Sequence, residues 1–321
     1  MSGHSQPPPP IDKGIFDLKF RAMGTGCAVK FMAETIELAK AYRSAVLSWV
    51  EAFEQKYSRF IEDSLISRIN RSAGVEAVEI DGEAEALLGM CDGIVFLSKG
   101  VLDPSSLPLT RLWGQKAREG VLPTDAEIAA AVELVGWGKI ERRPGQVFLP
   151  AEGMAIDLGG YGKEYAVDQV AEMGREFGIT RLLVDFGRDI RALGAPPDAP
   201  CWVVGVEDAT LPGDIFSRMA LLNRGLASSG NYRRFIEIGE ERFGHILDPR
   251  SGLPVHNRNQ GVTVLANTCL EAGVLSTTAF ILGPKEGMEL LENHVGVDGC
   301  LQTESAKLET RGFHSFEITD T

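Results

Sequence analysis

Positive charge, paired cysteines and long apolar runs are all scarce in this sequence. Its 32 Lys and Arg residues are outnumbered by 45 Asp and Glu, and the net charge of -13 argues against general affinity for nucleic acid or an anionic membrane. No apolar run approaches the ~20 residues of a membrane helix, so we expect no membrane span. Residues 1–10 contain four prolines and lack the apolar core of a signal peptide, so we interpret residues 1–15 as a disordered tail.

The five cysteines are scattered and include no Cys-x-x-Cys pair, which argues against both a disulfide framework and a zinc site. We therefore expect buried thiols and a cytoplasmic location, or a periplasmic one if an export segment has been removed. The sequence also lacks an internal repeat, a Walker loop and the dinucleotide fingerprint. Its 321 residues are 44% hydrophobic, enough for a sizeable core, and we take residues 16–321 as one domain.

A glycine-rich stretch near the middle of the chain is the strongest local signal. Residues 154–156 are typical of a short strand and residues 164–177 of an amphipathic helix, so the glycines at 159–162 lie at a strand-to-helix turn. Such a turn presents backbone N–H groups and a helix dipole to a phosphate, and Lys163 adds a positive charge there. Asp157 would repel a phosphate but suits a ribose, a base or a cation. A corner made only for packing is the open alternative.

Hydrophobic periodicity elsewhere predicts an α+β fold in which mixed and antiparallel sheets are flanked by helices. The expected helices span residues 36–60, 63–70, 81–97, 124–135 and 271–282. The expected strands lie in 16–31, which turns at 23–26, in a hairpin at 139–149, and at 181–185, 202–207, 218–222, 226–228 and 262–266. Residues 154–186 are predicted to form a β-α-β unit, and the strands after residue 200 to continue one sheet.

Polar residues in the second half are candidates for chemistry. An unperturbed histidine has a pKa near neutrality, so His245 is a possible general base, and Asp248 is close enough in sequence to orient it or a cation. The alternatives are a histidine bonded to a backbone carbonyl and an ordinary Asp-Pro turn. Ser228 and Ser229 suit a phosphate, whereas hydroxyls in the helix at 276–278 commonly bond back to the helix backbone.

Seven short segments follow one another along the chain: Met23-Gly24-Thr25, residues 58–70, Leu102-Asp103-Pro104-Ser105, residues 157–163, Ser228-Ser229-Gly230-Asn231-Tyr232, His245-Ile246-Leu247-Asp248-Pro249 and Leu275-Ser276-Thr277-Thr278. In this order they resemble the ApbE family of FAD:protein FMN transferases, and the resemblance covers about residues 16–292. The resemblance implies an enzyme that moves FMN from FAD to a Thr or Ser hydroxyl of a target protein, releases AMP and uses magnesium. The implied partners are FAD and an acceptor protein, with the cofactor in a cleft between the N-terminal helices and the later sheet.

The resemblance also assigns roles to individual residues. It implies FAD contacts at Met23, Phe60, Val101, Leu102, Asp103, Asp157, Lys163, Ser229, Ile246 and Leu247. His245 would take the proton of the acceptor hydroxyl, while Lys163 would help to neutralise phosphate charge. Magnesium would lie at the Gly160 carbonyl, at Thr277 and at position 273.

The chain departs from the family pattern at three positions. Gly273 stands where the family has its metal-binding aspartate, while Glu164 and Arg188 stand where it has glycines. Glu271 lies two residues before position 273, which on a helix turns it by roughly 200°, away from the same face. The alternatives are therefore a flavin-binding protein without transferase activity, or a hydrolase that splits FAD into FMN and AMP. Under the transferase interpretation, Gly273→Asp is predicted to increase magnesium-dependent turnover.

Overall fold

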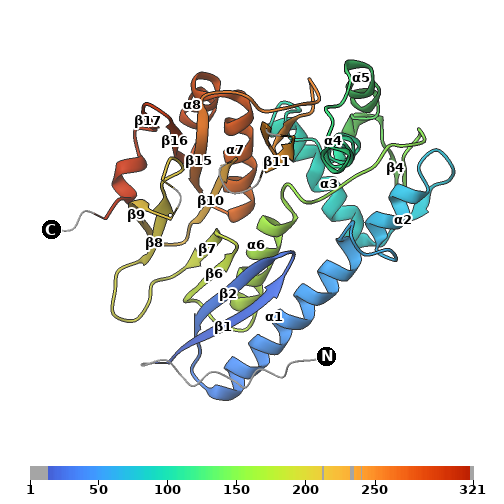
Figure 1. Ribbon diagram of the computed structural model, residues 1–321. Helices are drawn as coiled ribbons and strands as arrows, with labels where there is room; N and C mark the ends of the chain where they lie inside the picture. Colours follow the sequence, from blue (N-terminus) through green and yellow to red (C-terminus); the bar gives the residue numbers. More distant parts are fainter. Residues whose placement is uncertain (1–13, 212, 232–234, 240, 319–321) are drawn as a thin grey trace.

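The computed structural model describes residues 14–211, 213–231, 235–239 and 241–318, and it is built on an eight-stranded sheet (Figure 1). The strand order is β1-β2-β6-β7-β10-β15-β16-β17, and every neighbouring pair is antiparallel. The bounds are β1 Ile15–Ala22, β2 Thr25–Met32, β6 Leu182–Phe186, β7 Asp189–Leu193, β10 Gly225–Gly230, β15 Asn259–Ala266, β16 Asp298–Thr303 and β17 Lys307–Glu309. The predicted α+β class is confirmed.

Helices cover one face of this sheet. Their contacts with it are buried and apolar: α1 packs on β1, α6 on β6 and β7, α7 on β10 and β15, and α8 on β16. The bounds are α1 Ile36–Tyr57, α6 Gly162–Glu176, α7 Cys269–Leu282 and α8 Pro284–Glu292. Among the described residues, no helix has both the length and the apolar character that crossing a membrane requires.

The opposite face of the sheet is covered by a separate hairpin. Strands β8 (Trp202–Glu207) and β9 (Ile215–Leu221) pair only with each other among the described strands, and the short helix η2 (Phe313–Phe316) lies beside them. Successive side chains of β10 point to opposite faces of the sheet, so Leu226 contacts the β8-β9 hairpin while Ala227 faces α7. The prediction that residues 202–222 continue the main sheet is therefore wrong.

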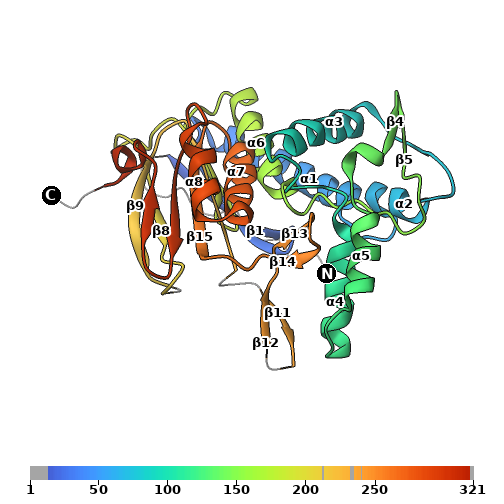
Figure 2. The ribbon, with the colours of Figure 1, turned by 90° about the horizontal axis from the view of Figure 1, so that it is seen from above.

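A second group of helices lies at one end of the molecule (Figure 2). It comprises α2 Leu65–Arg71, α3 Gly82–Leu97, α4 Leu107–Glu119, α5 Asp125–Glu133 and the turn η1 Trp137–Lys139, with a small sheet of β3 Val78–Glu79, β4 Glu141–Arg143 and β5 Gln146–Phe148. Capping residues fix several starts: Thr35, Ser64, Asp81 and Thr124 each accept a backbone N–H of the helix that follows. These four helix starts were predicted to within two residues, whereas α4 was not predicted.

Helix α4 supports the segment that precedes His245. Trp113 of α4, Ile128 of α5 and Ile238 form one buried cluster that holds the hairpin of β11 (Phe235–Ile238) and β12 (Glu241–Gly244) against these helices. The Trp113 indole N–H also donates to the Gly252 carbonyl at 2.8 Å, in the turn between β13 (Leu247–Asp248) and β14 (Leu253–Pro254). Figure 2 shows the β11-β12 hairpin projecting beside α4.

The predicted strand at residues 154–156 is not part of any sheet. Among the described residues, its strand-like pairing is limited to one isolated parallel bridge between Ser106 and Ala155. The Asn70 side chain takes the place of a partner strand, because its amide accepts the Ile156 N–H at 2.7 Å and donates to the Ile156 carbonyl at 2.9 Å. The β-α-β unit predicted over residues 154–186 is therefore wrong, and β6 pairs antiparallel with β2 and β7 instead.

Both ends of the chain differ from the prediction. Of the expected tail at residues 1–15, residues 1–13 lie outside the described residues, and Ile15 already belongs to β1. After α7, where the predicted elements end, the chain adds α8, β16 and β17. Between β6 and β7, Gly187 and Arg188 have φ of 63° and 78°, the conformation of a tight hairpin turn that favours glycine at both positions.

Candidate functional site

The glycine-rich turn before α6 is open to solvent and is held from two sides. Gly159 and Gly160 are exposed, and the Asp157 N–H donates to the Pro104 carbonyl at 2.8 Å. Leu102 packs over the turn, since a Cβ at Gly160 would lie 3.3 Å from its Cδ1. Within the described residues, no side-chain oxygen caps α6 at Tyr161. The Gly162 N–H donates to the Leu158 carbonyl at 2.6 Å, so the N–H groups of Lys163 and Glu164 are the ones in this turn that could attract an anion.

Arg59 fixes the Asp157 carboxylate beside this turn. Its Nε lies 2.8 Å from Asp157 Oδ2, and its guanidinium stacks 4.1 Å from the centroid of the Phe60 ring. The Phe60 side chain is 82% exposed, so its ring is available to a ligand next to Asp157. Partial desolvation and the neighbouring Arg59 lower the pKa of Arg111, while Asp157 raises it. Arg59 and Arg111 were not singled out from sequence, because arginines near a carboxylate are common in any surface.

Lys163 lies between two carboxylates. Its ammonium contacts Asp189, whose residue is only 4% exposed, and lies 3.9 Å from Glu164 Oε1. Asp189 follows the β6-β7 turn, and that turn lies beside the β1-β2 turn, since the Gly187 N–H donates to the Gly26 carbonyl at 3.0 Å. Met23, in that β1-β2 turn, has φ of 49° and donates its N–H to Glu54 Oε1 at 2.9 Å.

Hydroxyl groups gather where β10 meets α7. Ser229 Oγ lies 2.8 Å from Thr277 Oγ1 and 2.9 Å from Ser276 Oγ. Ser276 also donates to the Gly273 carbonyl at 3.0 Å, and Thr278 to the Val274 carbonyl at 2.7 Å. The expected back-bonding to the helix is thus confirmed for Ser276 and Thr278, while Thr277 faces Ser229.

Asp168 fixes α6 and α7 relative to each other. Its carboxylate accepts the N–H groups of Cys269 and Leu270 at 2.9 and 2.8 Å, which caps α7 from the neighbouring helix. Burial raises the pKa of Asp168 to about 6, although these two hydrogen bonds and Arg191 act in the opposite direction. Asp168, in the middle of α6, thus holds the start of α7, the helix that carries Gly273 and Thr277.

His245 lies in the bend after β12, in an exposed position. The next residues are tied to a neighbouring segment: the Ile246 carbonyl accepts the Val255 N–H at 2.9 Å, and Leu247 pairs with Pro254. Asp248 forms an ion pair with Arg250 at 2.7 Å and so organises its own turn, and its role beside His245 stays a prediction. Tyr232, part of the preceding sequence segment, lies outside the described residues.

Asp103 is fully used by its own loop. One carboxylate oxygen accepts the Ser105 N–H and hydroxyl at 2.7 and 2.6 Å, and the other accepts the Trp137 N–H at 3.0 Å. Val101 is buried at 1% exposure, whereas Leu102 is half-buried beside Gly160. The FAD contacts expected of these three residues stay predictions.

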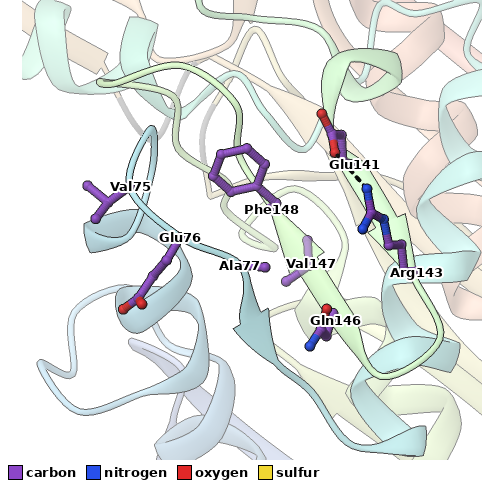
Figure 3. A pocket seen from close by; sticks show the side chains of 8 residues that line it. All are labelled: Val75, Glu76, Ala77, Glu141, Arg143, Gln146, Val147 and Phe148. Carbon is purple, nitrogen blue, oxygen red and sulfur yellow. Dashed lines mark ion pairs between the residues drawn. The ribbon is translucent and has the colours of Figure 1, made fainter.

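A hollow of about 330 Å³ lies elsewhere, on the small sheet of the N-terminal helical part (Figure 3). Its lining residues belong to or adjoin β3, β4 and β5: Val75, Glu76, Ala77, Glu141, Arg143, Gln146, Val147 and Phe148. They include none of the site residues predicted from sequence. The predicted FAD cleft between the helices and the sheet therefore stays a proposal.

Solved flavin transferase structures have the same fold as this chain. The flavin transferase ApbE from Vibrio cholerae superposes with a TM-score of 0.83 at 26% identity, over 94% of this chain and 99% of that one. An ApbE protein from Thermotoga maritima gives a TM-score of 0.86 at 27% identity, over 95% and 100% of the two chains. Residues 23–301 match the model of the ApbE family, and the chain belongs to that family.

Relatives of known name are similar along nearly their whole length. The FAD:protein FMN transferase of Haemophilus influenzae is 30% identical over 324 residues, which cover 96% of this chain and 92% of the relative. The protein of the same name from Vibrio cholerae is 29% identical over 276 residues, or 84% and 82% of the two chains. The resemblance inferred from seven short segments is thereby confirmed.

Proposed function

We propose that this protein is an FAD:protein FMN transferase, which moves FMN from FAD to a Thr or Ser hydroxyl of an acceptor protein and releases AMP. One observation carries the proposal: the open N-terminus of α6, with Lys163 in its first turn, packs against the hydroxyl-bearing face of α7 in a family of flavin transferases. A helix N-terminus with a neighbouring ammonium suits the pyrophosphate of FAD. A cytoplasmic location stays a prediction.

Different residues have different roles in the phosphoryl transfer. The exposed glycines and Lys163 hold negative charge on the phosphates, and the contact with Asp189 keeps the ammonium in place. The acceptor hydroxyl oxygen attacks the phosphorus on the FMN side, the bond from that phosphorus to the bridging oxygen breaks, and AMP leaves with the electron pair. His245 takes the hydroxyl proton. Its exposed position after β12 lets a protein substrate reach it.

The remaining proposed contacts surround this centre. The Phe60 ring, next to the Arg59-Asp157 ion pair, offers a face for a ring system of FAD. The other proposed FAD contacts are Met23, Val101, Leu102, Asp103, Ser229, Ile246 and Leu247. Magnesium would be held by the Gly160 carbonyl and the Thr277 hydroxyl, and when bound it would neutralise charge on the phosphate oxygens. Gly273 supplies no side-chain ligand.

The test uses the full chain with FAD, magnesium and an acceptor protein that carries an exposed threonine. The expected products are AMP and an acceptor that has gained the mass of an FMN ester. The matched variant His245→Asn should lower the rate by roughly 10²- to 10⁴-fold, the usual worth of a general base. AMP without a labelled acceptor would indicate an FAD pyrophosphatase instead, and tight FAD binding without AMP would indicate a flavin-binding protein.

A further inference from the structure

Glu164 is a buried carboxylate with an unused oxygen. The residue is 9% exposed, and within the described part of the chain its Oε2 has no hydrogen-bond partner. Its Oε1 lies 3.9 Å from the Lys163 ammonium, which is in closer contact with the buried Asp189. Two buried carboxylates therefore share one ammonium. A buried negative charge without a full partner is costly, so this position favours a cation.

The Glu164 side chain fills the space next to Gly273. A Cβ built at position 273 would lie 2.6 Å from Glu164 Cγ, 3.1 Å from its Cδ and 3.2 Å from its Oε1. A side chain at position 273 and the present Glu164 side chain thus exclude each other. The chain departs from the family pattern at both positions, and the structure brings the two departures into contact.

Other oxygen donors lie on the same two segments of the chain, in the turn before α6 and along α7. The exposed Gly160 comes four residues before Glu164, and Thr277 comes four residues after Gly273 on the same face of α7. The Thr277 hydroxyl is 2.8 Å from that of Ser229, which adds a further oxygen. Carboxylate, hydroxyl and carbonyl oxygens are the donors that magnesium and manganese prefer.

We propose that the Glu164 carboxylate is the anionic protein ligand of a divalent cation at the junction of α6 and α7, supplied from the helix opposite Gly273. The inference rests on the proposed function only for the substrate phosphates that would complete the coordination. It accounts for the missing carboxylate at position 273, because the negative charge would come from α6 and the Glu164 side chain lies next to Gly273.

The proposal reverses the effect expected of Gly273→Asp. From sequence alone, this change was predicted to increase magnesium-dependent turnover. In the structure, the new side chain would collide with Glu164 and place another carboxylate beside it, so Gly273→Asp alone should weaken cation binding. In a Glu164→Gly background the same change should strengthen it, because the space is then free.

The experiment measures binding of Mn²⁺ to the full chain by the EPR signal of free Mn²⁺, with and without FAD. Glu164→Gln should weaken Mn²⁺ binding at least about tenfold, as expected for loss of a charged ligand. The double variant Glu164→Gly/Gly273→Asp should bind within about threefold of wild type, while each single variant binds more weakly. Glu172→Gln, on an exposed part of the same helix, is the matched control and should change nothing.

FAD affinity measured by flavin fluorescence in EDTA separates a ligand role from a general structural one. If Glu164→Gln binds FAD within about twofold of wild type but loses Mn²⁺, the assignment is supported. Unchanged Mn²⁺ binding in Glu164→Gln, or a double variant no better than Glu164→Gly, would overturn it. The outcome is independent of FMN transfer: a chain that binds Mn²⁺ through Glu164 but never labels an acceptor would refute the proposed function and leave the metal ligand in place.

Discussion

Replacing Asn70 should disturb the segment that carries Asp157, since its amide is the hydrogen-bonding partner of both backbone groups of Ile156, at 2.7 and 2.9 Å. Ile156 is fully buried, so Asn70→Ala would leave a buried N–H and a buried C=O without that partner. At roughly 1–3 kcal/mol for each of the two groups, less about 0.5 kcal/mol gained in helix propensity, the free energy of unfolding should fall by about 1.5–5.5 kcal/mol.

Two variants of the same helix calibrate this prediction. Asn70→Asp keeps the acceptor for the Ile156 N–H but turns an oxygen toward the Ile156 carbonyl, so it should cost an intermediate amount. Arg68→Ala, at an exposed position of α2, should stay within about 0.5 kcal/mol of wild type. The measurement is urea unfolding followed by tryptophan fluorescence, together with FAD affinity, which we expect to fall because Asp157 directly follows Ile156. An Asn70→Ala protein as stable as Arg68→Ala would refute the reasoning.

Two further predictions follow from buried polar groups. In the folded protein the pKa of Asp168 is raised to about 6 from 3.8, so as the pH falls the folded protein protonates this carboxylate before the unfolded chain does. The contribution of Asp168 to the free energy of unfolding is therefore greatest below pH 3.8 and is lost as the pH rises through 6. As the pH is lowered from 7 to 4, the free energy of unfolding of wild type should increase by at most about 3 kcal/mol relative to that of Asp168→Asn, as measured by urea unfolding. A difference between the two proteins that does not change with pH would contradict the assignment. Trp113→Phe removes the bond to the Gly252 carbonyl and should cost about 1–2 kcal/mol and increase hydrogen exchange of the Val255 N–H; unchanged exchange would count against this link.

Local sequence signals predicted the helices that begin at a capping side chain and the hairpin that has a short turn. Thr35, Ser64, Asp81 and Thr124 are side-chain caps, so four helix starts were found within two residues. The hairpin at β1 and β2 was found because a short turn separates two strand-like runs. Helix α4 has no such mark: its N-cap residue Ser106 makes no side-chain capping bond, and a proline follows within its first turn.

Pairing over long distances was harder to predict. Residues 154–156 have the composition of a strand, but whether they join a sheet depends on Asn70, which lies far away in the sequence and supplies the hydrogen bonds that a strand would. Likewise, nothing local to residues 202–222 indicates that this hairpin packs across the sheet rather than extending it. Tertiary contacts decided both cases.

For the candidate site, the sequence predicted several of the individual features but not how they are arranged in space. The open start of α6, the position of Lys163 and the gathering of hydroxyls at Thr277 agree with the interpretation of the sequence. Asp248 and Asp103 were marked as site residues, and the structure gives their oxygens local partners. The contact between Glu164 and Gly273 was missed because it joins two helices, and helical periodicity carries no information about which side chains of another helix lie opposite.

The segments that we propose to form the site come from almost the whole length of the chain, from Met23 in the first hairpin to Thr277 in α7. Strand β2 lies beside β6, and the β11-β12 hairpin rests on α4, so neither end of the chain can complete the site without the other. A ligand that fits this site selects the completely folded protein over every partly folded form. FAD should therefore act as a reporter and a stabiliser of global folding, raising the unfolding temperature in proportion to the logarithm of its concentration.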